Sequence, residues 1–154
     1  MANLKSAKKS KLFDRIIVST DSKKIAKVAL NEGAEVPFIR SKELSDNYTN
    51  TREVIADTII KIGRKNKKDF ICCIFATAPF TTVNDLKKTF NIVKNKNCKY
   101  VFPITNYQYP IQRGIKLKKN NYISMINHKN FNKRSQDLKE MWHDAGQFLW
   151  AKSK

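Results

Sequence analysis

The chain is short, strongly basic and of ordinary hydrophobic content. It has 154 residues, of which 41% are hydrophobic, and a formal net charge of +18, which is enough chain for about one globular domain with a real core. No apolar run approaches the roughly 20 residues that span a bilayer, and residues 1–11 lack the apolar stretch of a signal peptide. We therefore expect a cytoplasmic protein with no membrane partner.

Helix and strand patterns alternate through the first two thirds of the sequence. The predicted helices cover residues 1–11, 22–31, 51–66 and 82–95, and the predicted strands cover residues 15–19, 35–39, 69–75 and 100–104. Gly33 is expected just beyond the end of the second helix, where glycine is common. This alternation predicts a three-layer α/β fold with a mostly parallel sheet.

The pattern changes after Ile104. Residues 111–117 and 122–126 predict an antiparallel hairpin with an Asn-Asn turn, residues 127–141 are irregular, and residues 147–150 form another apolar strand. A stretch of about 105–135 is too short to enclose its own core, so its apolar side chains should mark an interface. We expect it to protrude as a dimerisation arm and to make a homodimer contact through Tyr107, Tyr109, Ile111, Ile115, Tyr122 and Ile126.

The high positive charge does not by itself indicate a nucleic-acid binder. Lysines recur in every segment rather than clustering on one surface, and the phenylalanines of the predicted strands are expected to pack in the core rather than to stack on bases. We expect no specific nucleic-acid partner, although weak, salt-sensitive binding to polyanions follows from the charge. Cys72 and Cys73 are adjacent in an apolar strand and point to opposite faces, so no metal site is predicted there.

A polar cluster follows the first predicted strand. The apolar residues before Ser19 give way to Ser-Thr-Asp at the carboxyl end of that strand, which is the sheet edge where α/β proteins bind ligands. Two interpretations of Asp21 stay open, because Asp21 or Ser22 could also serve only as the cap of the next helix. Arg40 likewise follows the second strand, where it is either a ligand-binding side chain or part of a surface ion pair.

Five collinear segments resemble the CMP-sugar synthetase (acylneuraminate cytidylyltransferase) family, and most closely its pseudaminic acid cytidylyltransferase branch. They begin with Leu-Phe-Asp-Arg-Ile-Ile-Val-Ser-Thr-Asp-Ser at residue 12 and Glu-Val-Pro-Phe-Ile-Arg at residue 35. The more specific texts are Phe-Ala-Thr-Ala-Pro-Phe, Tyr-Pro-Ile-Gln-Arg, and Arg-Ser-Gln-Asp-Leu followed by His-Asp-Ala-Gly-Gln-Phe. The resemblance covers nearly the whole chain and implies a Rossmann-like fold.

The resemblance also implies an activity and a set of site residues. Enzymes of this family transfer CMP from CTP to a nonulosonic acid, here pseudaminic acid or a relative, and release pyrophosphate with the help of Mg²⁺. The residues implied on the nucleotide side are Asp21, Arg40, Thr51 and Thr77. Those implied on the sugar side are Phe75, Gln112, Arg113, Arg134, Gln136, His143 and Asp144. Phe75 or Ala76 stands where sialic acid synthetases carry a substrate-binding glutamine, which fits a different sugar.

The sequence departs from the family where the triphosphate would bind. It holds four glycines, all far apart, so the glycine-rich loop that cradles the phosphates is absent, no catalytic residue is assigned, and the Mg²⁺ ligands are expected outside this chain. We therefore expect residues 1–154 to be a single partial cytidylyltransferase domain, weakly active or inactive alone. The alternatives are a non-catalytic remnant that binds a sugar or a partner, and a basic polyanion-binding domain.

Overall fold

The computed structural model describes residues 2–63 and 70–152. The chain divides into two compact units, one made of Met1–Phe102 with Gly146–Lys154 and the other of Pro103–Ala145. Each unit is described by itself. Within the described ranges, no helix combines the length and the apolar character that crossing a membrane requires.

The first unit is built on a three-stranded sheet. Its strands are β1 (Phe70–Ile74), β2 (Tyr100–Val101) and β7 (Phe148–Lys152), and β7 lies between the other two. Both neighbours pair with β7 in the antiparallel sense, with Cys72 opposite Trp150 in one ladder and Val101 opposite Trp150 in the other. Since β1 and β2 both run opposite to β7, they run in the same direction as each other.

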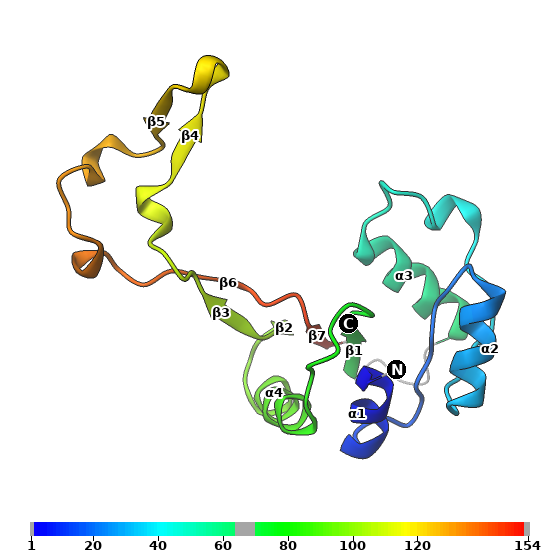
Figure 1. Cartoon of the computed structure of the whole chain (residues 1–154). Helices are drawn as coiled ribbons and strands as arrows, with labels where there is room; N and C mark the ends of the chain where they lie inside the picture. Colours follow the sequence, from blue (N-terminus) through cyan, green and yellow to red (C-terminus); the bar gives the residue numbers. More distant parts are fainter. Residues whose placement is uncertain (1, 64–69, 153–154) are drawn as a thin grey trace. The chain divides into compact units, whose positions relative to one another are not determined.

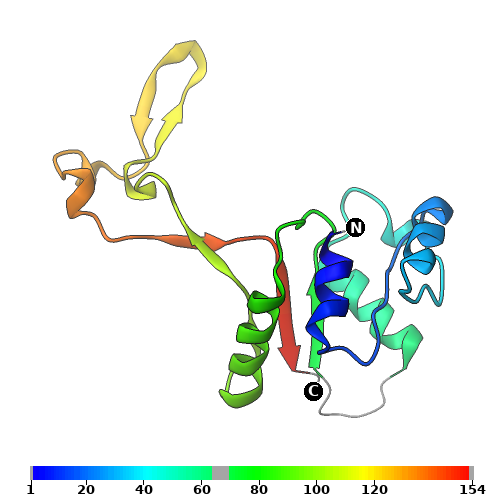
Figure 2. The ribbon, with the colours of Figure 1, turned by 60° about the horizontal axis from the view of Figure 1, so that its bottom comes forward.

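The main core lies on one face of this sheet. Phe148 and Trp150 alternate along β7 and are 0% and 1% exposed, because they pack against Leu86 and Val93 of α4 (Val83–Asn95). The Phe13 ring stacks on the Trp150 ring with 5.3 Å between the centroids. Figure 2 shows α4 and α1 (Ala2–Ser10) lying along the strands of the sheet.

Each later helix of this unit starts at a residue that suits a cap. Ser22 accepts a hydrogen bond from the Ile25 amide at the start of α2 (Lys23–Asn31), and Asn50 accepts one from the Glu53 amide at the start of α3 (Thr51–Ile62). Thr82 and Asp85 form a capping box at α4. These side chains satisfy amides that a helix leaves unpaired in its first turn. The predicted end of the third helix, residues 64–66, lies outside the described residues.

The segment after α1 pairs with the segment after α2. The Glu35 amide donates to the Ile16 carbonyl over 2.8 Å, and the Val18 amide donates to the Glu35 carbonyl over 2.9 Å. A small second core covers this pairing, formed by Leu4, Ala29 and Ala34 with Ile16, Val18 and Val36 against them. Gly33 has a φ of +73°, as expected of a residue just beyond a helix end.

The described residues correct the prediction of a mostly parallel sheet. All pairings between named strands are antiparallel, and the predicted strands at 15–19 and 35–39 reduce to one parallel bridge between Ile17 and Glu35. The reason is the path of the chain, which leaves β2 for the second unit and re-enters next to β2 as β7. β3 and β6 lie on the outgoing and the returning path and pair in the antiparallel sense, as β2 and β7 do. The mixed α/β composition is confirmed.

The second unit contains two short antiparallel ribbons, together with short 3₁₀ turns and irregular chain (Figure 1). β3 (Ile104–Asn106) pairs with β6 (Trp142–Asp144), and β4 (Ile115–Leu117) pairs with β5 (Ile123–Met125). The Asn-Asn turn predicted for the hairpin is confirmed, since Asn120 and Asn121 have φ values of +72° and +61°. The predicted strand over 100–104 is wrong in one detail, because it breaks between β2 and β3, where Pro103 has no amide hydrogen to donate.

We predict that replacing Phe148 by alanine will strongly destabilise the first unit. The side chain is 0% exposed in the core of the sheet, and such truncations cost about 3–5 kcal/mol. The control is Phe80→Ala, because Phe80 is 84% exposed and should cost less than about 0.5 kcal/mol. Urea unfolding followed by circular dichroism measures both. Equal midpoints for the two variants would contradict the placement of Phe148 in the core.

Candidate functional site

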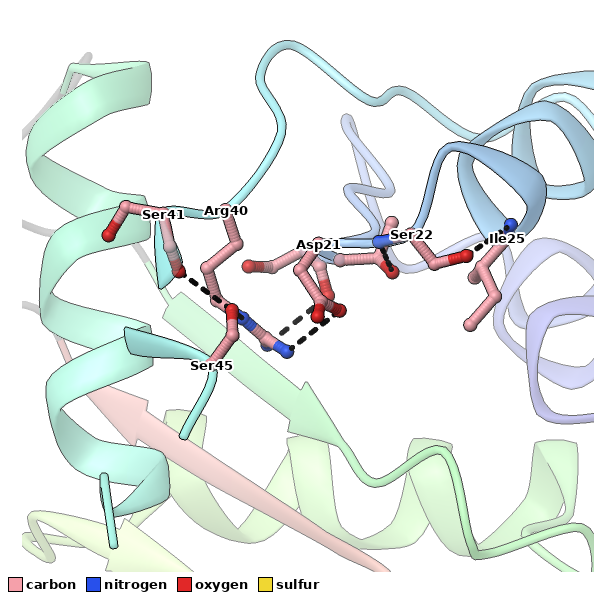
Figure 3. Close-up of polar contacts among 8 residues, drawn as sticks. Asp21, Ser22, Ile25, Arg40, Ser41 and Ser45 are labelled. Atoms are coloured by element: carbon pink, nitrogen blue, oxygen red, sulfur yellow. Dashed lines mark hydrogen bonds and ion pairs between the residues drawn. The ribbon is translucent and has the colours of Figure 1, made fainter. Parts of the chain in front are cut away.

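The paired segments of the first unit bring Asp21 and Arg40 together. The Arg40 amide donates to the Thr20 carbonyl over 2.9 Å, which extends the pairing of the segment 16–18 beyond the Ile17–Glu35 bridge. The side chains of Asp21 and Arg40 consequently point toward each other, as Figure 3 shows. Two polar residues 19 positions apart in sequence thus meet because both end neighbouring extended segments.

The guanidinium of Arg40 has three partners. Its Nε donates to the Ser45 hydroxyl over 3.0 Å, one Nη lies 3.5 Å from the Ser19 carbonyl, and the other lies 3.7 Å from the Asp21 carboxylate. The side chain is only 22% exposed. The group is therefore held by neutral oxygens and faces one carboxylate at long range, which leaves donors available to an anion.

The structure separates the roles of Asp21 and Ser22. The hydroxyl of Ser22 caps α2, and its own amide donates to the Thr20 hydroxyl over 3.1 Å. Asp21 is instead the partner of Arg40 and keeps a side chain that is 53% exposed. The interpretation of Arg40 as part of an ion pair holds in this structure, and it does not conflict with anion binding.

The loop after Arg40 is closed by its own side chains. A short 3₁₀ turn, Lys42–Leu44, is followed by Ser45, whose hydroxyl donates to the Ser41 carbonyl over 2.7 Å. Farther along, the Asp46 carboxylate accepts from the backbone amides of Tyr48 (3.0 Å) and Thr49 (2.6 Å). The hydrogen bonds from the Thr49 side chain, the Thr49 amide and the Tyr48 amide hold the pKa of Asp46 below its ordinary value.

Thr51 is the first residue of α3 and is exposed, and the capping oxygen of that helix belongs to Asn50. No contact in the described structure links Thr51 to Arg40, so its place near the nucleotide stays a prediction.

The turn after β1 holds the next two predicted residues. The Phe75 amide donates to the Gln147 carbonyl over 3.0 Å, and the Phe75 carbonyl accepts from the Asn3 side chain over 2.8 Å. Thr77 is exposed beside Ala78, which is 5% exposed. The turn is thus anchored by Gln147, which precedes β7, and by Asn3 of α1, while Thr77 is exposed. That Thr77 shares a cleft with Arg40 stays a prediction.

Most of the predicted sugar-side residues lie in the second unit, where several already hold local contacts. Arg134 makes two hydrogen bonds to the Asp137 carboxylate, at 2.7 and 3.1 Å. Arg113 donates to the Lys133 carbonyl over 3.1 Å, and Gln112 donates to the Lys139 carbonyl over 2.7 Å. The last two contacts connect the irregular segment 127–141 to the residues that precede β4.

The remaining sugar-side residues lie near the β3–β6 ribbon. The His143 ring packs on the Tyr107 ring with 4.7 Å between centroids, and its Nδ1 lies 2.8 Å from the Asp144 carbonyl oxygen. Gln136 lines a hollow of about 210 Å³ together with Tyr107 and Glu140. Asp144 thus belongs to the second unit, so the predicted cleft that joins it to Asp21, Arg40 and Thr77 stays a prediction.

The sequence interpretation missed several residues that the geometry brings forward. Ser45 and the Ser19 carbonyl hold Arg40, and Tyr107 holds His143. A serine five residues after an arginine at a strand end does not by itself predict a contact between the two side chains. The contact depends on the 3₁₀ turn Lys42–Leu44, which sequence periodicity does not indicate. Tyr107 was expected only as an interface residue.

The described residues show no preformed cluster of metal ligands. Across residues 2–63 and 70–152, no three His, Cys, Asp or Glu side chains gather closely enough to hold a metal ion. Asp21, which was expected on the nucleotide side, faces the Arg40 guanidinium. Mg²⁺ is commonly held by one or two protein carboxylates together with substrate phosphates, so the position of its ligands stays a prediction.

Comparison with known proteins gives consistent matches over nearly the whole chain. A family model described as "Cytidylyltransferase" matches residues 3–152. A pseudaminic acid cytidylyltransferase of Campylobacter jejuni is 38% identical over 153 residues, which are 99% of this chain and 66% of that protein. The chain therefore spans slightly less than two thirds of the length of this relative.

Two further relatives are longer or more distant. A Helicobacter pylori protein named as both a pseudaminic acid cytidylyltransferase and a UDP-2,4-diacetamido-2,4,6-trideoxy-beta-L-altropyranose hydrolase is 32% identical over 145 residues, 94% of this chain and 28% of that protein. A CMP-N,N'-diacetyllegionaminic acid synthase of Legionella pneumophila is 31% identical over 103 residues, 65% of this chain and 44% of that protein.

We predict that the loop after Arg40 stays ordered in mild acid and opens only in stronger acid. A lowered folded-state pKa means that the Asp46 carboxylate stabilises the loop above the ordinary aspartate pKa, and that this contribution is lost as the pH falls through the lowered value. The amide chemical shifts of Tyr48 and Thr49, followed by NMR, should titrate with a midpoint below about 3.9. Asp46→Asn should abolish the transition, and a midpoint above that value would contradict the hydrogen bonds described.

Proposed function

The chain belongs to the cytidylyltransferase family, and from this membership we propose that the protein transfers CMP from CTP to pseudaminic acid or a related nonulosonic acid and releases pyrophosphate. Relatives that match almost the whole chain carry the name pseudaminic acid cytidylyltransferase. The legionaminic acid synthase is similar over a shorter stretch, which favours pseudaminic acid as the sugar.

The observation that carries the proposal is the arrangement around Arg40. Its guanidinium lies at the ends of two paired extended segments, and its contacts to Ser45 and Ser19 use neutral oxygens. A guanidinium binds pairs of phosphate oxygens and keeps its charge at any ordinary pH. Catalysis of phosphoryl transfer depends chiefly on such positioning and on charge stabilisation, so we assign Arg40 to the nucleotide phosphates, with Thr51 and Thr77 beside it.

The second unit carries the groups that an acidic, hydroxylated sugar needs. Arg113 and Arg134 supply cations, and Gln112, Gln136 and His143 supply further hydrogen-bonding groups. We propose that these side chains, with Asp144, bind the nonulosonic acid. The carboxylate of Asp137 that Arg134 now holds would compete with the sugar carboxylate for that arginine.

Magnesium and the complete fold also belong to the proposal. Mg²⁺ would neutralise the CTP phosphates, and its ligands are expected outside this chain. The two parallel strands β1 and β2, joined by α4, support a Rossmann-like sandwich as the framework.

We predict that CTP binding depends on Arg40 and that turnover needs more of the family's length than this chain spans. Isothermal titration of the 154-residue chain should show CTP binding that Arg40→Ala weakens at least about tenfold, which is 1.4 kcal/mol. Arg134→Ala should leave CTP affinity unchanged and weaken pseudaminic acid binding.

A chain extended with the flanking segments of the C. jejuni relative should form the CMP-sugar in the presence of Mg²⁺, and the reaction should stop when EDTA is added.

The same experiments separate the alternatives. Sugar binding without turnover by the extended chain would favour a non-catalytic binding module. If polyphosphates and heparin bind as tightly as CTP does, and if the affinity of all three falls equally as the salt concentration rises, the site is a general polyanion surface. Pyrophosphate release by the 154-residue chain alone would show that its own residues suffice for the reaction.

We also propose that the second unit, as a dimerisation arm, makes a homodimer contact. Many of its large apolar side chains are exposed, including Ile115 (58%), Leu117 (75%), Tyr122 (72%) and Ile126 (60%). Such a concentration of exposed apolar surface usually marks an interface.

The dimer prediction is tested by placing a charge in that surface. Ile115→Glu should shift the chain toward monomer in analytical ultracentrifugation at micromolar concentration and moderate salt, because a buried unpaired carboxylate opposes association. Ile60→Glu is the matched control, since Ile60 is 79% exposed on α3 of the first unit. A monomeric wild-type chain under these conditions would overturn the proposal.

A further inference from the structure

Ser45 occupies a specific place beside the guanidinium of Arg40. Its hydroxyl lies 3.0 Å from Arg40 Nε and 2.7 Å from the Ser41 carbonyl oxygen. Figure 3 shows the Ser45 side chain between these two groups. Although neither the alternation of elements nor the family resemblance singled out this residue, it makes the shortest of the three contacts to Arg40.

The two contacts of Ser45 fix the direction of its hydroxyl group. A carbonyl oxygen can only accept, so the single hydroxyl proton points to Ser41 and a lone pair is left for Arg40 Nε. The 3₁₀ turn Lys42–Leu44 sets the position of the side chain, since the Ser45 amide donates to the Lys42 carbonyl over 3.0 Å. The hydroxyl thus accepts from Arg40 in one geometry.

We propose that Ser45 is a positioning residue for Arg40. By accepting from Nε, it sets the plane of the guanidinium and leaves the two Nη groups to face Ser19 and Asp21. An arginine side chain otherwise has many rotamers, and holding it in one of them before a ligand arrives removes part of the entropy cost of binding. That this ordering serves the phosphates of CTP rests on the proposed function.

The contact to Asp21 is consistent with this role. The Asp21 carboxylate lies 3.7 Å from Arg40 Nη2, beyond hydrogen-bond length, and its side chain is half exposed. The carboxylate is thus a loose partner that a phosphate oxygen can replace at the Nη groups. Ser45 contacts a different nitrogen, so its hydrogen bond can persist when the ligand binds.

The first arm of the test needs no ligand. In NMR spectra of the 154-residue chain, the Arg40 Nε–H should give a resolved signal that exchanges slowly with water. Ser45→Ala should remove this protection, whereas Ser45→Thr, which keeps the hydroxyl, should retain it. The matched control is Ser41→Ala in the same loop, which should leave the Arg40 signal protected. The Ser41 side chain hydrogen-bonds Glu43: after the Glu43 backbone amide, it is the second cause that lowers the pKa of Glu43.

The second arm measures the Kd of CTP by isothermal titration. Ser45→Ala should weaken binding by about three- to tenfold, as the loss of one hydrogen bond predicts, and Ser45→Thr should restore it. In the Arg40→Ala background, Ser45→Ala should cause no further loss of CTP affinity. If Ser45 only stabilised the loop, its removal would weaken CTP binding in this background too. Melting temperatures of all variants are measured alongside, so that unfolding is recognised.

The two arms fail in different ways. An Arg40 Nε–H that stays protected in Ser45→Ala overturns the positioning role. If Ser45→Ala loses the protection of Arg40 Nε–H but keeps the CTP affinity of the wild type, the positioning of Arg40 by Ser45 does not contribute to CTP binding, and that part of the proposal is overturned. If the wild-type chain binds no CTP while the NMR results are as expected, Ser45 does position Arg40 and the proposed nucleotide site is wrong.

Discussion

The placement of β7 between β1 and β2 is the constraint on which the first unit depends. Residues 148–152 are the last described part of the chain, yet they provide the central strand of the sheet and its two most buried aromatic side chains, Phe148 and Trp150. Without β7, the strands β1 and β2 would have no hydrogen-bonded neighbour in this sheet, and α4 would lose the surface on which Leu86 and Val93 pack. The strands β1 and β2 and the helix α4 are therefore stabilised by a segment that lies far from them in sequence.

The candidate nucleotide site also depends on the pairing of segments that are separated in sequence. Arg40 and Asp21 come together because residues 16–20 and 35–40 pair side by side, and that pairing is supported by a separate small core of alanines and aliphatic residues. Two backbone segments bring the charged groups near each other, and the loop that follows determines how the guanidinium is oriented.

The sequence predicted the helices well and the sheet poorly, for physical reasons. Helix starts are local, so Ser22 and Thr82 could be recognised beside the apolar periodicity that follows them. Strand direction depends on partners far away in sequence, and β6 was missed because its residues Trp142–Asp144 are all exposed and show no alternation. The meeting of Asp21 and Arg40 was predictable from strand ends, whereas Ser45 depends on a three-residue turn with no periodic signature.

The ends of the second unit lie close together, because the Ala145 amide donates to the Pro103 carbonyl over 3.0 Å. The β3–β6 ribbon closes at this point, so everything between residues 106 and 142 is an excursion whose length matters little to the pairing at its base. Closing a longer loop costs only about 0.6 kcal/mol for each doubling of its length. Insertions, deletions or a whole exchanged hairpin can therefore accumulate in this excursion while the ribbon at its base stays intact, which makes it the part of the molecule where evolution or grafting can most easily change recognition.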